Sequence, residues 1–250
     1  MPAVGALYDS MTMQPPPSGE PATSAWPPPV AAHREARFDA PGAPPYPRHG
    51  SILTLLRFMG AHGMLSPRYA RMLIALAWHK ARLGKRLELD GIAFIRPGVR
   101  LEVGPAARLR LGRWSWLGDG TKVRVHEGEV SIGAKSVLGQ ECTISCYQRI
   151  SIGRECMVAD RSMLIDFDHV IDDVEQPIRK QGIRKCAVDI GHNVWLGYGV
   201  CVLRGVSVGD NCVIGASAVL TANAPANAVL AGIPARVIRM REPPITLRFE

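Results

Sequence analysis

The sequence lacks several features that define common classes of protein. Its six cysteines include no Cys-x-x-Cys pair, which argues against a zinc–thiolate or disulfide redox site. No stretch approaches the ~20 apolar residues that a membrane-spanning helix needs. The first residues show no charged segment followed by an apolar core, so no secretory signal is expected. We therefore expect a reduced, cytoplasmic protein whose cysteines serve packing.

Acidic residues are missing from one part of the chain. The 250 residues carry a formal net charge of +8, with 30 Lys and Arg against 22 Asp and Glu. Residues 51–86 contain seven Arg and Lys and no acid, so most of the excess charge belongs to this segment. Most of the basicity is therefore one local feature. No nucleic-acid partner is expected.

The second half of the chain repeats a six-residue pattern: an aliphatic residue, usually followed by glycine, with a small residue at the fifth place. The clearest copies lie at residues 132–143, 152–163, 190–201 and 208–219. A period of six fits neither a 3.6-residue helix nor an alternating strand. It predicts an all-β solenoid, a parallel β-helix whose coils each cover the interior of the next. The aliphatic residue is expected to point inward, and the glycine to permit the turn after each strand. The fifth places hold Ser136, Cys142, Cys156, Ser162, Val194, Val200, Cys212 and Ala218.

The chain divides into four parts by composition. Residues 1–48 are rich in proline and cannot bury a core, so they are expected to be a disordered tail. Residues 49–88 form the basic, helical segment, residues 89–240 the β-helix, and residues 241–250 a C-terminal tail. The repeat is loose up to Val130, halts after Leu164 and resumes at Ile190. The interruption predicts a loop at 166–189, and solenoid insertions commonly carry function.

Two helices are expected in the basic segment. The first contains the apolar cluster of residues 52–59, and the second runs from Pro67 to Leu83 with Ser66 as its N-cap. Apolar residues 72–78 with flanking cations are compatible with two roles. The helix could lie peripherally on an anionic membrane surface, or it could cap the open end of the solenoid.

Three motifs give the chain a resemblance to a known family. They are Asp166–His169, Asn193–Gly197 and the ending Ala231–Arg239. With the hexapeptide pattern, they resemble the hexapeptide-repeat acyltransferases, and especially the maltose, galactoside and xenobiotic O-acetyltransferases. The resemblance covers about residues 89–239. It implies a left-handed β-helix, a handedness that the period alone does not show, and a CoA-dependent O-acyltransferase with acetyl-CoA as donor and no metal.

The resemblance assigns His169 as the catalytic base. An acceptor hydroxyl needs a group that removes its proton as it attacks a thioester, and an imidazole with an ordinary pKa of about 6.5 suits this near neutral pH. Asp166, Asp168 or a backbone carbonyl is expected to orient the ring, and the two aspartates are expected to lie near the acceptor. Without the resemblance, a loop histidine is more simply a solvated polar residue.

The donor site also follows from the resemblance. Trp195 matches a tryptophan beside the pantetheine arm, although packing at a subunit contact is an alternative role for it. Arg236, followed by Arg239, matches the basic residue that meets the 3′-phosphate of CoA. The backbone positions that match donor-binding ones are Ala216, Thr221 and Ala222.

The acceptor is less well indicated. Gln140 and Glu141 stand where sugar-acetylating relatives often have asparagine near the acceptor, which puts a maltose-like or galactoside-like acceptor in doubt. A hydroxyl of another saccharide or glycoconjugate is expected. The basic stretch 176–185 either folds over an anionic ligand or is solvated charge.

The resemblance also predicts the assembly. A homotrimer is expected, with His169 of one chain facing Trp195 and the Arg236 region of its neighbour. Two alternatives remain. One is a non-catalytic trimeric scaffold, and the other is a β-helical carbonic anhydrase with a metal held by His126, His169 and His192 across a subunit boundary. The latter lacks the close histidine pair that such a site uses.

Overall fold

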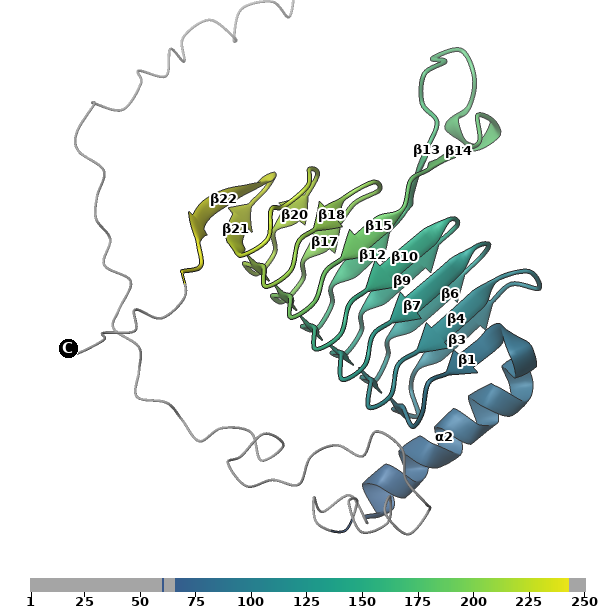
Figure 1. Cartoon of the computed structure of the whole chain (residues 1–250). Coiled ribbons are helices and arrows are strands. Elements are labelled where there is room, and N and C mark those ends of the chain that lie inside the picture. Colours follow the sequence, from purple (N-terminus) through teal and green to yellow (C-terminus); the bar gives the residue numbers. More distant parts are fainter. Residues whose placement is uncertain (1–59, 61–65, 243–250) are drawn as a thin grey trace, which may run out of the picture. The chain divides into compact units, whose positions relative to one another are not determined.

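The computed structural model describes residue 60 and residues 66–242, so the expected first helix, the proline-rich tail and most of the C-terminal tail lie outside the described residues. The described chain begins with one long helix, α2 (Pro67–Leu83), and a single turn of 3-10 helix, η1 (Gly84–Arg86). Short strands then wind into a solenoid (Figure 1). The predicted bounds of this helix are confirmed. None of the described helices is long and apolar enough to span a bilayer.

The solenoid has three parallel sheets, and the chain visits them in the order A, B, C in each coil. Sheet A contains β1 (Leu87–Leu89), β4 (Arg108–Leu111), β7 (Glu129–Ile132), β10 (Arg149–Ile152), β15 (Val188–Ile190) and β18 (Ser207–Val208). Sheet B contains β2 (Phe94–Ile95), β5 (Trp116–Leu117), β8 (Val137–Leu138), β11 (Met157–Val158), β16 (Trp195–Leu196), β19 (Val213–Ile214), β21 (Ala228–Gly232) and, antiparallel at its edge, β22 (Ala235–Met240). Sheet C contains β3 (Arg100–Val103), β6 (Lys122–Val125), β9 (Thr143–Cys146), β12 (Met163–Ile165), β17 (Cys201–Val202) and β20 (Val219–Leu220). The parallel β-helix expected from the hexapeptide period is confirmed.

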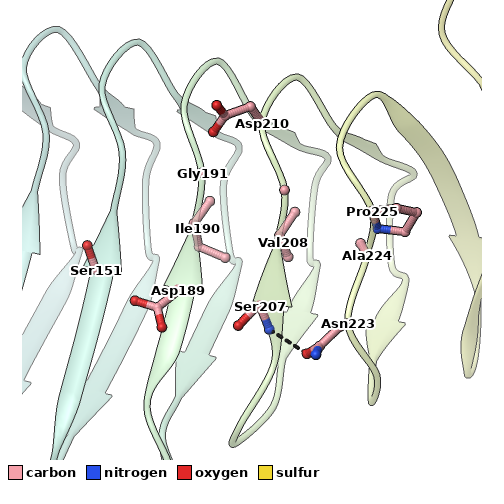
Figure 2. Close-up of a pocket in the computed structure, with 11 residues that line it drawn as sticks. Ser151, Asp189, Ile190, Gly191, Ser207, Val208, Asp210, Asn223, Ala224 and Pro225 are labelled. Atoms are coloured by element: carbon pink, nitrogen blue, oxygen red, sulfur yellow. Dashed lines mark hydrogen bonds between the residues drawn. The ribbon is translucent and has the colours of Figure 1, made fainter.

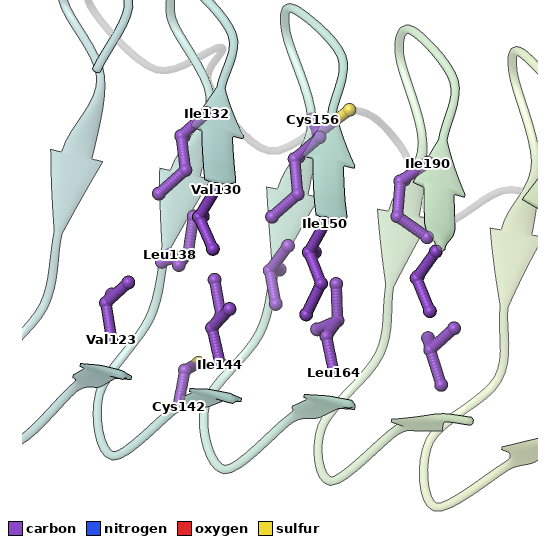
Figure 3. Packing of buried hydrophobic residues seen from close by; sticks show 14 of the residues in the cluster. Val123, Val130, Ile132, Leu138, Cys142, Ile144, Ile150, Cys156, Leu164 and Ile190 are labelled. Atoms are coloured by element: carbon purple, nitrogen blue, oxygen red, sulfur yellow. The ribbon is translucent and has the colours of Figure 1, made fainter. Parts of the chain in front are cut away.

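The aliphatic residues of the repeat fill the interior, as the period predicts. On sheet C, for example, Val123, Ile144 and Leu164 stack in register, and each is fully buried (Figure 3). The buried side chains form one continuous cluster that runs the length of the coils. The cysteines at the fifth places, Cys142 and Cys156 among them, are buried free thiols.

The repeat glycine does a different job from the one expected. Glycines at the second place, such as Gly133, have ordinary negative φ and do not make the turn. A Cβ on Gly133 would instead collide with the carbonyl group of Gly153 in the next coil. The turn conformation falls on the fourth place, where φ is +61° at Lys135 and +53° at Asn193. Glycine at the second place is therefore needed because the coils stack closely there, and the left-handed backbone conformation of the corner falls on the residue at the fourth place.

The coils shorten along the chain. On sheet A, Leu87 pairs with Leu109 in the first coils and Val130 pairs with Ile150 in the middle ones. After the insertion, Ile190 pairs with Val208. The number of residues between the two paired positions therefore decreases from the first of these pairs to the last. The early coils are longer because their strands on sheets A and C reach four residues, against two or three after the insertion, and this explains why the hexapeptide pattern is loose before Val130.

Helix α2 caps the N-terminal end of the solenoid. Leu76 and Leu83 join the hydrophobic core, and Met72 is fully buried. The guanidinium groups of Arg82 and Arg86 donate hydrogen bonds to the carbonyls of Leu101 and Val103 on β3, the edge strand of sheet C. The helix therefore covers apolar interior and satisfies carbonyls of an open sheet edge. Ser66 is at the N-cap in extended conformation, but its side chain makes no capping hydrogen bond.

The expected loop is a hairpin that projects from the coils (Figure 1). Its arms are β13 (Phe167–His169) and β14 (Ile183–Lys185), which pair antiparallel, and its tip contains the short helix η2 (Ile178–Lys180). The flanking coils close up beneath it, because β10 pairs directly with β15. The hairpin leaves and re-enters the solenoid at the corner between sheets C and A.

Candidate active site

His169 lies at the end of β13, exposed, on the arm of the projecting hairpin. Its pairing partner across the hairpin is Ile183, so its position depends on how the hairpin is held at its base. An exposed imidazole on a projecting arm is accessible to a ligand from outside the chain. The remaining contacts at this corner show what holds the arm.

Asp166 anchors the base of the hairpin. Its carboxylate is fully buried and accepts hydrogen bonds from the backbone N–H groups of Tyr147, Gln148 and Arg149, at 2.8, 2.7 and 2.8 Å. The thiol of Cys146 donates a fourth. Ile165 pairs with Ser145, so the residues that follow them, Asp166 and Cys146, are neighbours in adjacent coils, and both side chains point into the solenoid. This placement corrects the expectation that Asp166 lies near the acceptor: its oxygens are committed to the preceding coil.

An aromatic stack supports the same base and was not foreseen from the sequence. The rings of His126 and Tyr147 stack at 4.5 Å between centroids, and Phe167 meets Tyr147 edge-on at 4.6 Å. Lys185, which pairs with Phe167 across the hairpin, places its ammonium 5.3 Å from the Tyr147 ring centre and forms an ion pair with Glu127. The stack follows the corner along the solenoid axis. The sequence offered no local pattern for this stack, because its rings come from three successive coils.

Asp168 is held by the coil that follows the hairpin. Its carboxylate accepts a hydrogen bond from Nε of Arg204 at 2.7 Å, and both side chains are partly exposed. Arg204 lies in the next corner between sheets C and A, so this ion pair ties β13 to the coil above. Arg204 was not singled out in the sequence, because a single arginine in a turn carries no recognisable pattern.

Gln140 and Glu141 lie at a different corner, between sheets B and C. Glu141 has φ +55° and accepts a hydrogen bond from Nε of Arg161 at 2.7 Å. The backbone N–H of Gln140 donates to Asp160 at 2.7 Å. The ring of Tyr198 lies 6.0 Å from the Arg161 guanidinium and is about half exposed. These side chains form a polar ridge that, in one chain, is separate from His169.

Trp195 lies on the outer side of sheet B. Its register partners are Met157 and Val213, and Met157 pairs with Val137. Val137, Met157 and Trp195 are 40%, 55% and 49% exposed, which makes this outer face apolar along its length. A row of exposed apolar side chains on a flat sheet is typical of an interaction surface.

The other predicted donor-binding residues are exposed and lie on different sides. Thr221 and Ala222 follow β20 at the corner between sheets C and A, above Arg204. Ala216 lies at the corner between sheets B and C. Arg236 is exposed on β22, where Nη1 donates to the carbonyl of Ala235. One chain therefore distributes the predicted site over two corners and one face.

A hollow on the outer side of sheet A contains none of the predicted residues. Its polar lining includes Ser151, Asp189, Ser207 and Asn223, one from each of four successive coils (Figure 2). Asn223 accepts a hydrogen bond from the backbone N–H of Ser207 at 2.8 Å. Arg149 pairs with Asp189 beside it. The hollow is an open, shallow part of the sheet surface.

The three histidines of the metal-site alternative do not lie at one corner. His126 and His169 belong to the corner between sheets C and A, whereas His192 lies between sheets A and B. Nδ1 of His192 accepts a hydrogen bond from the backbone N–H of Arg154, so that nitrogen is occupied. Within residues 66–242, no group of three His, Cys, Asp or Glu is arranged to hold a metal ion.

The four buried cysteines are poor candidates for covalent chemistry. Burial raises the pKa of the Cys142, Cys156 and Cys212 thiols. Burial, together with the negative charge of Asp166, raises the pKa of Cys146 further. These thiols stay protonated at neutral pH and are weak nucleophiles.

Comparison with known proteins places this chain in a family. Residues 187–222 match the family model described as Bacterial transferase hexapeptide (six repeats). The chain is 32% identical over 161 residues to WcaF of Escherichia coli, which is named for acetyl transfer in colanic acid biosynthesis. That match covers 64% of this chain and 70% of WcaF. The chain belongs to the hexapeptide-repeat acetyltransferases.

Other relatives of this hexapeptide-repeat acetyltransferase agree. It is 36% identical over 202 residues to "Probable acetyltransferase Rv3034c" of Mycobacterium tuberculosis, across 78% of this chain and 66% of that protein. It spans about half the length of several further acetyltransferases. Among solved structures, AntD, an N-acyltransferase from Bacillus cereus, superposes with a TM-score of 0.57 at 15% identity, over 67% of this chain and 90% of AntD. At that identity the likeness shows a shared fold.

Proposed function

We propose that this hexapeptide-repeat acetyltransferase transfers an acyl group, most simply acetyl, from coenzyme A to a hydroxyl of a saccharide or glycoconjugate. Family membership supports the reaction class. The AntD structure, which is a complex with coenzyme A, and a relative named galactoside O-acetyltransferase support a CoA thioester and a sugar-containing acceptor. Because acyl-CoA is a cytoplasmic metabolite, the proposal places the reaction in the cytoplasm. The residues below are assigned roles on their chemistry and placement.

His169 is the general base of the proposed reaction. Its ring takes the proton of the acceptor hydroxyl as that oxygen attacks the thioester carbonyl. A backbone N–H group of the adjoining coil holds the oxyanion, and the C–S bond then breaks to release the CoA thiolate, which takes up a proton. The proposed transfer is direct, and the buried cysteines, which are held as thiols, are unsuited to form an acyl-enzyme.

One observation carries the proposal that the site is shared between chains. His169 leaves the solenoid at the corner between sheets C and A, while Trp195 lies on sheet B. In a coil of three sheets, that corner and that face are on opposite sides, so one chain does not bring the two residues together. A cyclic homotrimer with the outer face of sheet B at its subunit boundary joins them. The exposed apolar row Val137, Met157 and Trp195 supports burial of that face.

Donor and acceptor roles follow from this arrangement. Trp195 packs beside the pantetheine arm, and Thr221, Ala222 and Ala216 supply backbone groups along it. Arg236 binds the 3′-phosphate. Asp168, fixed by Arg204, and the ridge of Gln140 and Glu141 are proposed to contact the acceptor. The arm of the hairpin opposite His169 carries Arg184 and Lys185, whose charges are paired with Asp172 and Glu127.

The reaction is tested by a screen of acyl-CoA donors and saccharide acceptors that follows free thiol release. We expect His169→Ala to lower the transfer rate by about two to four orders of magnitude while leaving donor binding intact. The matched control is His192→Asn, which changes a histidine at another corner and keeps an acceptor for the Arg154 N–H. A His169→Ala enzyme that turns over as fast as the parent with the same acceptor would refute the role of the base.

The shared site is tested by mixing chains. His169→Ala and Trp195→Ala chains, each poorly active alone, are unfolded and refolded together. If each site takes His169 from one chain and Trp195 from its neighbour, about a quarter of the sites regain both residues on random assembly. A site built within one chain gives no recovery, and light scattering of an active monomer would also contradict the trimer.

A further inference from the structure

Helix α2 has a second apolar face that the solenoid does not use. Met72, Leu76 and Leu83 face the coils, yet Ile74 and Trp78 on the same helix are 68% and 58% exposed. The exposed positions recur every three or four residues and so form one continuous outward stripe. This outward face of α2 consists of Ala70, Arg71, Ile74, Ala77, Trp78 and Ala81.

Cations frame this outward face, and no acid lies on the helix. Arg71 and Lys85 are exposed at its two ends. Lys80, by contrast, is turned back to the carbonyls of Gly84 and Leu87, and so helps to end the helix. The guanidinium of Arg82 lies 5.0 Å from the centre of the Trp78 ring. An apolar stripe with Trp at its centre and cations at its edges is the composition of a helix that lies on a membrane surface.

We propose that the outward face of α2 docks on an anionic lipid bilayer, with Ile74 and Trp78 entering the boundary between headgroups and acyl chains. Charge complementarity selects this occupant. The preceding segment 51–65 is apolar but carries an arginine and no acid, so it offers nothing to neutralise Arg71 and Lys85. Two copies meeting through this face would bring like charges together. An anionic bilayer supplies both an apolar interior and negative charge.

The placement of the helix favours this docking. The outward face is directed away from the end of the solenoid, because the opposite face covers the first coil. In the homotrimer of the proposed function, parallel solenoids present three such faces on the same side. Only this part of the proposal rests on the proposed function. Three weak contacts on one bilayer combine to hold the enzyme more firmly than one. Docking then places the site beside saccharides attached to lipid.

The test uses the full chain and sedimentation with vesicles, either pure phosphatidylcholine or an equal mixture with phosphatidylglycerol. We expect retention on the mixed vesicles at low salt, little on the neutral ones, and release as salt screens the charges. Trp78→Asp should weaken binding by more than about ten-fold. Arg71→Glu should weaken it by about five-fold or more, since one cation near the surface accounts for ~1 kcal/mol.

Two matched variants control for the change in charge. Val174→Asp adds the same carboxylate at another exposed apolar residue, and Arg154→Glu reverses a charge far from the helix. Both should bind vesicles like the parent. Brominated lipid should quench tryptophan emission in the parent and much less in Trp78→Phe, which shows insertion of that ring.

Three results would overturn the proposal. The first is a parent protein that stays in the supernatant with mixed vesicles at low salt. The second is a Trp78→Asp protein that sediments like the parent. The third is a change of oligomeric state in Trp78→Asp by light scattering, which would make a second copy the occupant. Transfer to a soluble acceptor should be unchanged in Trp78→Asp, so a failure of docking is distinguished from a failure of the proposed activity.

Discussion

Replacing Asp166 tests how the hairpin is held. In the parent, this buried carboxylate receives three backbone N–H groups from residues 147–149 and the thiol of Cys146. Asp166→Ala removes all four contacts and leaves a void at an inward rung. The turn at residues 147–149 then loses the carboxylate that binds its backbone, whereas the ion pair of the Arg149 side chain with Asp189 stays in place.

The expected cost follows from the exposure of the donors. A hydrogen bond to a charged group contributes about 1.5–3 kcal/mol when it is lost from a buried site. Gln148 and Arg149 lie at the surface, so water replaces part of what their N–H groups lose. We therefore expect Asp166→Ala to lower the free energy of unfolding by about 2–4 kcal/mol in total rather than by a sum of full contributions. Asp166→Asn, which keeps shape but loses charge, should have a stability between those of the parent and Asp166→Ala.

Asp168→Ala is the matched control. It removes the same kind of side chain further along the same arm, where the partner Arg204 and the carboxylate are both partly exposed. An exposed ion pair is worth less than about 1 kcal/mol, so its loss should be small. Urea unfolding followed by circular dichroism measures both variants. Equal free energies for Asp166→Ala and Asp168→Ala would refute the role of the buried carboxylate as an anchor.

Three further predictions concern the core, the capping helix and the donor. Gly133→Ala should destabilise the solenoid by about 1–3 kcal/mol in urea unfolding, because the new Cβ meets the backbone of the next coil. Gly199→Asn is the control and should be tolerated, because Gly199 lies at a corner with φ +67° where a Cβ makes only an ordinary contact. Burial and the nearby charge of Arg82 lower the pKa of His79. The unfolded chain therefore binds the proton more readily, and stability should fall as pH drops below about 6.5, with a smaller slope in His79→Met. Arg236→Ala should weaken the binding of acyl-CoA by about 1.5–3 kcal/mol, seen in steady-state kinetics as a higher apparent Michaelis constant. The constant for the 3′-dephospho analogue should change much less. Equal weakening of both donors would contradict the phosphate contact.

The sequence predicted the repeating part of the molecule well because the period of six has one physical solution. Inward residues such as Ile132 and Leu138 were identified by position alone, and the helix Pro67–Leu83 by its cap and apolar spacing. The role of the second-place glycine was misjudged, because a residue pattern does not distinguish a positive φ from a close approach between coils. Only the stacked backbone shows that Gly133 meets Gly153.

The corner that carries His169 was harder to predict. Asp166 begins the motif that contains His169, but its actual partners lie in the preceding coil, at the short turn between β9 and β10. Arg204, the partner of Asp168, lies in the coil that follows the whole insertion. Such contacts depend on which corners are superposed, and superposition follows from coil length rather than from local spacing.

The direct pairing of β10 with β15 has a consequence for how such an enzyme can change. Ile150 and Val188 are adjacent across the sheet although the rest of one coil and the entire hairpin separate them in sequence. The coil therefore closes without reference to the length or composition of residues 170–182, which extend outside it. A loop grafted between β12 and β15 in place of residues 170–182 would keep the buried carboxylate of Asp166 as the anchor at its base and would have a different tip. Acceptor preference could then diverge among related proteins while the scaffold and the donor surface stay the same.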